Sequence, residues 1–247
     1  MALSPIGILC ATPEELAALR ARLVLDAAPV DYGPTQVWTG AHDGRPLALA
    51  LCGIGKVNAA AAATLLLSVF GARELIFSGV AGGLNPDLPV GAVLLGARLA
   101  IHDFGVIAEG AFTPTQSGLI PLGAPRLSDV APVAAPVAAT LEALRAAVAG
   151  DLEGPVSLGA IVTADYFLNC ARTRNDLRAA FAADAIDMES GAVNQVVQAW
   201  RARLYVIRTL SDQAGEDSHL TYPQMAAMAA HNSALCVPVL LDILARA

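Results

Sequence analysis

The sequence is poor in charged and aromatic residues, which make up only 15% and 5% of its 247 residues. Lys and Arg (15) are fewer than Asp and Glu (22), so the formal net charge is −7. Proteins that bind nucleic acid or anionic membranes use Lys and Arg to neutralise phosphates. This charge balance argues against nucleic-acid and membrane partners and leaves a small molecule as the expected ligand.

Cysteine and histidine are also scarce, with four residues of each. No two cysteines have the Cys-x-x-Cys spacing of a structural zinc site, and the histidines are dispersed. We therefore expect neither a metal nor another cofactor. Cysteines that are reduced, mostly buried thiols are typical of a cytoplasmic protein, which is the location we expect.

No stretch is long and apolar enough to predict a membrane span. Residues 57–72 are interrupted by Asn58, Thr64 and Ser68 and fall short of the roughly 20 apolar residues that cross a bilayer. No basic segment precedes an apolar run at the N-terminus, so we expect no secretory signal. The motifs Gly-x-Ser-x-Gly, His-Glu-x-x-His and Gly-x-Gly-x-x-Gly are missing too, which argues against serine hydrolases, zinc hydrolases and dinucleotide enzymes.

Apolar residues, by contrast, make up 55% of the chain and recur in an alternating pattern. Buried strand-like runs alternate with helical patterns, and Asp43-Gly44 predicts a hairpin with a type I′ turn between residues 36–42 and 45–51. Residues 104–125 have no clear period and are predicted to form a long loop. The pattern predicts an α/β fold, a three-layer α/β/α sandwich around a mixed, mostly parallel sheet, formed by one domain over residues 1–247.

Acidic residues follow three of the predicted strands. Glu15 comes after residues 6–11, Asp187 and Glu189 after the short run that begins at 185, and Asp212 after residues 204–209. The carboxyl ends of parallel strands are where α/β sheets bind ligands, although Glu15 alone would also suit a helix N-terminus. Acids that follow three strands at one edge indicate a site that protonates a leaving group and activates water, as cleavage of a bond to a sugar requires.

Two glycine loops and an aromatic segment also follow predicted strands. The loops are Gly53-Ile54-Gly55-Lys56 and Gly79-Val80-Ala81-Gly82-Gly83, and Tyr166-Phe167 follow residues 156–163. Glycines let the backbone approach a ligand closely, and Phe167 either stacks on a planar base or packs in the core.

Six separated segments occur in the order seen in the nucleoside phosphorylase and nucleosidase superfamily. The chain resembles this superfamily over nearly its whole length, and within it the 5′-methylthioadenosine/S-adenosylhomocysteine nucleosidases. The segments that carry the resemblance are residues 6–15, 53–57, 79–83, 162–168, 187–189 and 208–212.

The resemblance implies a catalytic set. Glu15 would orient and deprotonate the attacking water, with Arg208 helping to hold it. Asp212, positioned by Ser211, would protonate N7 of a departing adenine. Glu189 would hold the ribose through its hydroxyls.

The resemblance also implies a nucleoside site and a homodimer. Phe167 would stack on the base and Leu168 would read its edge, whereas Ile54 and Tyr222 would line the pocket for a 5′-thio group. In relatives the neighbouring subunit completes that pocket, and Phe104 and Phe112 are our candidates for this contribution. The full substrate-binding set is Ile54, Val80, Ala81, Gly82, Phe167, Leu168, Asp187, Met188, Glu189 and Tyr222.

Two departures from the family pattern favour hydrolysis over phosphorolysis. Val80 stands where relatives usually carry a hydroxyl residue, and the first arginine is Arg20, well past the first loop. A phosphate dianion without such ligands would be costly to desolvate. Three alternatives stay open: a hydrolase of another 5′-modified nucleoside such as futalosine, a nucleoside phosphorylase, and a non-catalytic nucleoside-binding protein.

Overall fold

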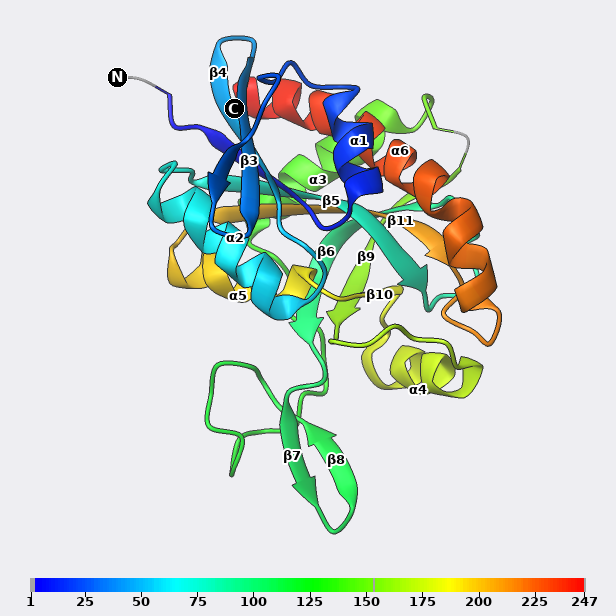
Figure 1. Ribbon diagram of the computed structural model, residues 1–247. Coiled ribbons are helices and arrows are strands. Elements are labelled where there is room, and N and C mark those ends of the chain that lie inside the picture. Colours follow the sequence, from blue (N-terminus) through cyan, green and yellow to red (C-terminus); the bar gives the residue numbers. More distant parts are fainter. Residues whose placement is uncertain (1–2, 153, 247) are drawn as a thin grey trace.

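The protein is built on a nine-stranded sheet, seen edge-on in the computed structural model, which describes residues 3–152 and 154–246 (Figure 1). In sheet order its strands are β10 (Ala185–Asp187), β9 (Val156–Thr163), β6 (Val93–Ile101), β11 (Arg203–Asp212), β5 (Glu74–Gly83), β1 (Ile6–Cys10), β4 (Arg45–Leu51), β3 (Thr35–His42) and β2 (Val30–Tyr32).

The central strands β11, β5, β1 and β4 are parallel neighbours, and so are β6, β9 and β10. β6 runs antiparallel to β11, and the β2–β3–β4 edge is antiparallel. The predicted hairpin is present: Asp43 and Gly44 have φ angles of 47° and 79°, as a type I′ turn requires. The predicted mixed sheet is therefore confirmed.

Helices cover both faces of this sheet (Figure 1). One face carries α1 (Pro13–Arg20), α3 (Ala135–Val148) and α6 (Ser218–Ala245), and the other carries α2 (Lys56–Ser68) and α5 (Ser190–Ala199). The remaining helix, α4 (Ala171–Phe181), packs near β9 and β10 through Leu177 and Phe181. The predicted three-layer sandwich is confirmed.

The sequence predicts a long loop over 104–125, but the first part of this segment forms strands. Residues 105–114 form a second, two-stranded sheet of β7 (Gly105–Ala108) and β8 (Ala111–Pro114), which projects away from the body (Figure 1). Glu109 and Gly110, both at positive φ, form its turn. Most side chains of this hairpin are exposed, so they lack the inside–outside alternation that identifies a strand. We call residues 104–126 the arm.

The C-terminal helix α6 begins at Ser218, four residues before the Tyr222 start that the sequence predicts. Its length and hydropathy would suffice to cross a membrane, but half of its apolar window is buried inside the protein. It packs against β5, β11, α1 and α3, and this burial accounts for its composition.

Candidate active site

A cavity of about 330 Å³ opens where β1, β5, β9, β10 and β11 end. Every predicted substrate-binding residue lines it, together with Glu15, Ser211 and Asp212. The lining residues are Ala11, Thr12, Glu15, Ile54, Val80, Ala81, Gly82, Tyr166, Phe167, Leu168, Ile186, Asp187, Met188, Glu189, Ser211, Asp212 and Tyr222.

Glu15 is both a helix cap and a cavity residue. Its backbone N–H donates to Thr12 Oγ1 at 3.3 Å, while its Oε2 accepts hydrogen bonds from the Ala11 and Thr12 amides at 2.6 and 3.2 Å. Its Oε1 accepts from the Val80 amide at 3.0 Å. Burial raises the pKa of Glu15 above 4.5, against the opposing effects of Arg208 and these amides. A carboxylate that is fixed by these amides and has a raised pKa can accept a proton from water.

Glu189 is 5% exposed and reaches the first glycine loop. Its Oε1 accepts a hydrogen bond from the Gly55 amide at 2.9 Å, and its Oε2 lies 3.4 Å from Arg208 Nη2. Burial raises the pKa of Glu189 to about 7, and the charge of Asp187 adds to this rise, whereas Arg208 opposes it. The side chain can therefore act as a hydrogen-bond acceptor or donor near neutral pH.

Asp187 lines the cavity, but protein groups already occupy its carboxylate. Thr163 Oγ1 donates to its Oδ1 at 2.5 Å, and Arg208 Nε and Nη2 lie 3.0 and 2.9 Å from its Oδ2. Ser190 contributes its backbone amide and its hydroxyl. The carboxylate of Asp187 therefore anchors Arg208 and the first residues of α5, and its predicted contact with substrate stays a prediction.

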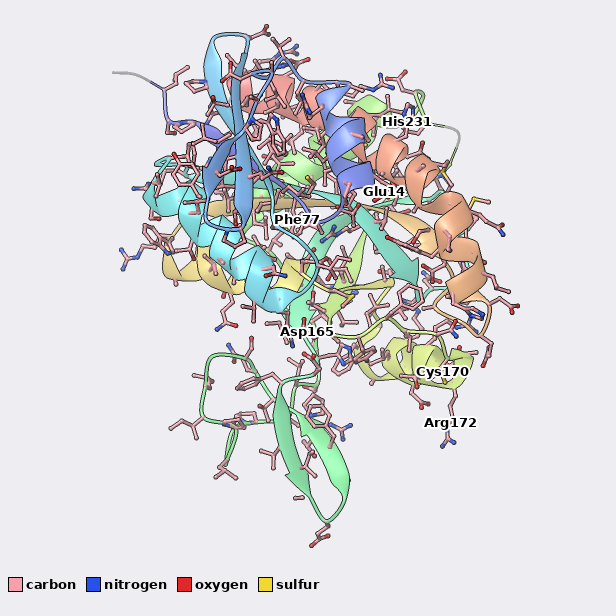
Figure 2. All side chains as sticks on the ribbon, in the orientation of Figure 1. Glu14, Phe77, Asp165, Cys170, Arg172 and His231 are labelled. Carbon is pink, nitrogen blue, oxygen red and sulfur yellow. The ribbon has the colours of Figure 1, made fainter. Side chains whose placement is uncertain are left out.

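Arg208 lies beneath the cavity floor rather than in its lining. It is fully buried, with its guanidinium carbon 4.1 Å from the centre of the Phe77 ring, which Figure 2 labels. Nη1 has no hydrogen-bond partner among the described residues. A Cβ on Gly79 would lie 2.5 Å from Glu15 Oε1 and closer still to this Nη1, so only glycine fits between them. Arg208 pairs with Asp187 and Glu189, and its predicted part in holding the attacking water stays a prediction.

Asp212 lines the cavity at the end of β11. Its Oδ2 accepts a hydrogen bond from Ser211 Oγ at 2.9 Å, and its Oδ1 accepts from the Ala214 amide at 2.8 Å. Ser211 Oγ also lies 3.3 Å from the Ala81 carbonyl oxygen. Asp212 is 2% exposed, so its orientation is fixed by protein groups rather than by solvent.

Apolar and aromatic side chains form the mouth of the cavity. Phe167 is 48% exposed, and its ring meets the edge of Tyr222 at a centroid distance of 5.8 Å. Ile54 is also half exposed, whereas Leu168 is buried. An exposed ring at a cavity mouth offers a face on which a planar base can stack.

Sequence reasoning missed four lining residues: Ala11, Thr12, Tyr166 and Ile186. Each adjoins a predicted site residue or follows a strand. This position in the sequence could have identified them as lining residues. The Tyr166 hydroxyl is 3.0 Å from His102 Nε2. Burial raises the pKa of Tyr166 to about 12 and lowers that of His102, so this pair is neutral at physiological pH.

The lining of the cavity is rich in acidic residues. Four of its lining residues are acidic, and in the part of the chain that the structure describes none of the lining residues is Lys or Arg. A positively charged transition state would be stabilised here, whereas an entering dianion would be repelled.

A separate cluster lies at the turn between β3 and β4. Potential metal-ligand atoms of His42, Asp43 and Asp242 are within 4.8 Å of one another. His42 Nε2 is 2.6 Å from Asp242 Oδ1, and this pair accounts for the cluster without an ion. These residues do not line the cavity.

The chain is similar to known proteins over almost its whole length. It is 37% identical to the 5′-methylthioadenosine/S-adenosylhomocysteine nucleosidase of Mycobacterium tuberculosis, with 97% of each chain covered. It is 30% identical to the aminodeoxyfutalosine nucleosidase of Campylobacter jejuni, with 93% of this chain and 94% of that one covered.

A solved structure shares the same fold. The 5′-methylthioadenosine/S-adenosylhomocysteine nucleosidase of Helicobacter pylori matches with a TM-score of 0.83 and 27% identity, over 98% of this chain and 99% of that one. That protein is complexed with a pyrrolidinol carrying a 4-aminopyrrolopyrimidine and a propynylthiomethyl group. The sequence model of the phosphorylase superfamily matches residues 5–244. The chain therefore belongs to the phosphorylase superfamily, and the resemblance that its motifs carry is confirmed.

Proposed function

We propose that this protein is a purine nucleosidase that hydrolyses the N-glycosidic bond of 5′-methylthioadenosine, S-adenosylhomocysteine or both, releasing adenine. The observation that carries the proposal is the meeting of Glu15, Glu189 and Asp212, three buried carboxylic acids from distant segments, in one cavity. Relatives named as nucleosidases of these two compounds match 97% of this chain.

The geometry supports a division of labour between the three acids. Asp212, held by Ser211 and the Ala214 amide, donates a proton to N7 of adenine and so makes the base a better leaving group. Glu15, whose pKa is raised by burial, takes a proton from the attacking water. Glu189 binds the ribose hydroxyls, and the negative cavity stabilises the cationic sugar between them.

Water rather than phosphate is the proposed nucleophile. The Val80 amide, which could otherwise bind an anion, already donates to Glu15 Oε1, and the Val80 side chain has no donor. Arg208 is engaged by Asp187 and Glu189 beneath the floor. A phosphate dianion would therefore enter an acidic cavity without a cationic partner, at a large desolvation cost.

The 5′ side of the substrate is proposed to be closed by a second subunit. Ile54 and Tyr222 line one wall of the cavity, and the arm carries exposed apolar residues, including Phe112 at 46% and Ile107 at 75% exposure. We propose a homodimer in which Phe104 and Phe112 of one arm cover the 5′-thio group in the partner's cavity. The exposed apolar arm supports this arrangement.

Adenine release identifies the activity. The protein is incubated separately with 5′-methylthioadenosine, S-adenosylhomocysteine and aminodeoxyfutalosine, and free adenine is quantified by chromatography. Rapid release from the first two supports the proposal, and release from none of the three would overturn it. Preference for aminodeoxyfutalosine would favour the second candidate function, which the similarity to the Campylobacter jejuni nucleosidase supports.

A cytoplasmic location and a role in methionine salvage belong to the same proposal, as does action as one domain without a metal or cofactor. The substrate class supports the salvage role, because hydrolysis of a methylthio nucleoside frees adenine and a sulfur-bearing sugar. The proposed mechanism needs only carboxylic acids and water.

A further inference from the structure

Asp103 lies outside the cavity lining and bonds to two segments, those of Lys56 and Asp165, that border the cavity. Its Oδ1 lies 2.5 Å from Lys56 Nζ, and its Oδ2 accepts a hydrogen bond from the Asp165 amide at 2.9 Å. Asp165 completes the cluster, because its Oδ1 accepts from the Lys56 amide at 2.9 Å and its Oδ2 lies 3.6 Å from Lys56 Nζ. Three charged residues from three distant segments are thus mutually bonded.

Two of the three segments in this cluster, those of Lys56 and Asp165, lead directly to cavity residues. Lys56 ends the glycine loop, residues 53–56, which carries Ile54 and donates the Gly55 amide to Glu189. Asp165 belongs to the aromatic loop, residues 164–168, which carries Phe167. Figure 2 shows Asp165 at the edge of the body where the arm begins. Asp103 itself stands between β6 and the arm.

Local structure alone does not fix the glycine loop. Gly53 and Gly55 have φ angles of 84° and 100°, and the N-cap of α2 is Gly55, which has no side chain to cap the helix. Asp165 supplies the missing cap through its bond to the Lys56 amide. The side chains of Lys56 and Asp103 are only 20% and 22% exposed, so solvent screens their ion pair less than one on the open surface.

We propose that Asp103 is a positioning residue that, with Lys56 and Asp165, fixes the separation between the glycine loop and the aromatic loop. It thereby sets how the cavity mouth fits the base and the 5′ substituent, without touching the substrate. This role rests on the proposed nucleosidase function for its kinetic consequence but not for its structural one.

Kinetics separate positioning from chemistry. In Asp103→Ala and Lys56→Met, KM for 5′-methylthioadenosine should rise about tenfold while kcat stays within about threefold, since charge-assisted hydrogen bonds that shape the binding site are lost. Asp103→Asn keeps one acceptor and should give an intermediate KM. The matched control is Glu142→Gln, which removes an exposed ion pair with Arg145 on α3.

Hydrogen exchange tests the same role without reference to activity. Amides of residues 53–58 and 164–168 should exchange faster in Asp103→Ala and Lys56→Met than in wild type, and at the wild-type rate in Glu142→Gln. Unchanged exchange in both loops would overturn the proposal, as would a fall in kcat with KM unchanged. If Asp103→Ala does not fold, Lys56→Met decides the question by both readouts. If the wild type releases no adenine, the function fails and exchange alone decides the positioning role.

Discussion

The floor and the mouth of the cavity differ in how the chain holds them. The floor residues Glu15, Glu189 and Asp212 are 2–5% exposed, and each carboxylate is bound by backbone amides or neighbouring side chains. At the mouth, Ile54 and Phe167 are 52% and 48% exposed and stand on loops. The groups proposed for chemistry thus lie at strand ends, on the rigid part of the scaffold. Those proposed for specificity lie on loops at the open mouth of the cavity, where a partner subunit can complete the site.

The largest effect of a floor substitution is expected at Asp212. Asp212→Asn keeps the shape and the bond from Ser211 but cannot supply a proton, so kcat should fall about 10³-fold with binding of a substrate analogue retained. Steady-state kinetics and calorimetry measure the two effects. Asp151→Asn, on an exposed turn, is the control. Turnover like that of wild type would remove Asp212 from the mechanism.

Glu15→Gln is expected to have the next largest effect. Glutamine preserves the capping box of α1 but cannot accept the proton of water, so kcat should fall about 10²-fold. The neighbouring Glu14→Gln, on the exposed side of the same helix, should leave kcat unchanged. An unaffected rate in Glu15→Gln would place the base elsewhere.

A mouth residue should respond differently. Phe112→Ala on the arm should raise KM for 5′-methylthioadenosine about tenfold with little change in kcat, because it removes apolar cover from the 5′ group. The control is Val24→Ala, a change at another exposed apolar residue away from the arm. Analytical ultracentrifugation should give a dimer for both variants. A loss of kcat in Phe112→Ala would contradict the proposal that mouth residues act in binding and floor residues in chemistry.

The smallest predicted effect concerns stability and pH. The folded-state pKa of Glu189, about 7, lies above its ordinary value of 4.5, so ionisation of this residue costs stability. That cost is absent below about pH 4.5 and fully present above pH 7. Glu189→Gln should therefore gain Tm relative to wild type between pH 5 and pH 8, by a few degrees, since 1 kcal/mol corresponds to about 2–4 °C at this chain length. Parallel Tm–pH curves would contradict it, and Glu14→Gln is the reference.

The sequence predicted the floor well because its residues follow strands that are recognisable as continuous apolar runs. Glu15, Glu189 and Asp212 each stand just beyond such a run, and parallel strand ends must meet at one edge. The direction of Arg208 could not be predicted, because inward and outward positions of a fully buried strand look alike in the sequence.

The mouth was harder to predict because its order depends on contacts between distant segments. The arm hairpin exposes both faces of its strands, so no periodicity identifies it. Pro223, the residue after the predicted start of α6, lies inside the helix, so proline did not mark where it begins. The bonds of Asp103 to Lys56 and Asp165 join residues 47 and 62 positions apart, which no local pattern reveals.

The identity of the nucleophile distinguishes hydrolysis from phosphorolysis. The protein is incubated with 5′-methylthioadenosine in H₂¹⁸O with saturating phosphate, and the sugar product is analysed by mass spectrometry. We expect free methylthioribose that forms at the same rate with or without phosphate and carries one ¹⁸O at C1, measured before exchange with solvent. A sugar 1-phosphate would show that the acidic cavity admits the dianion, and water would then not be the nucleophile.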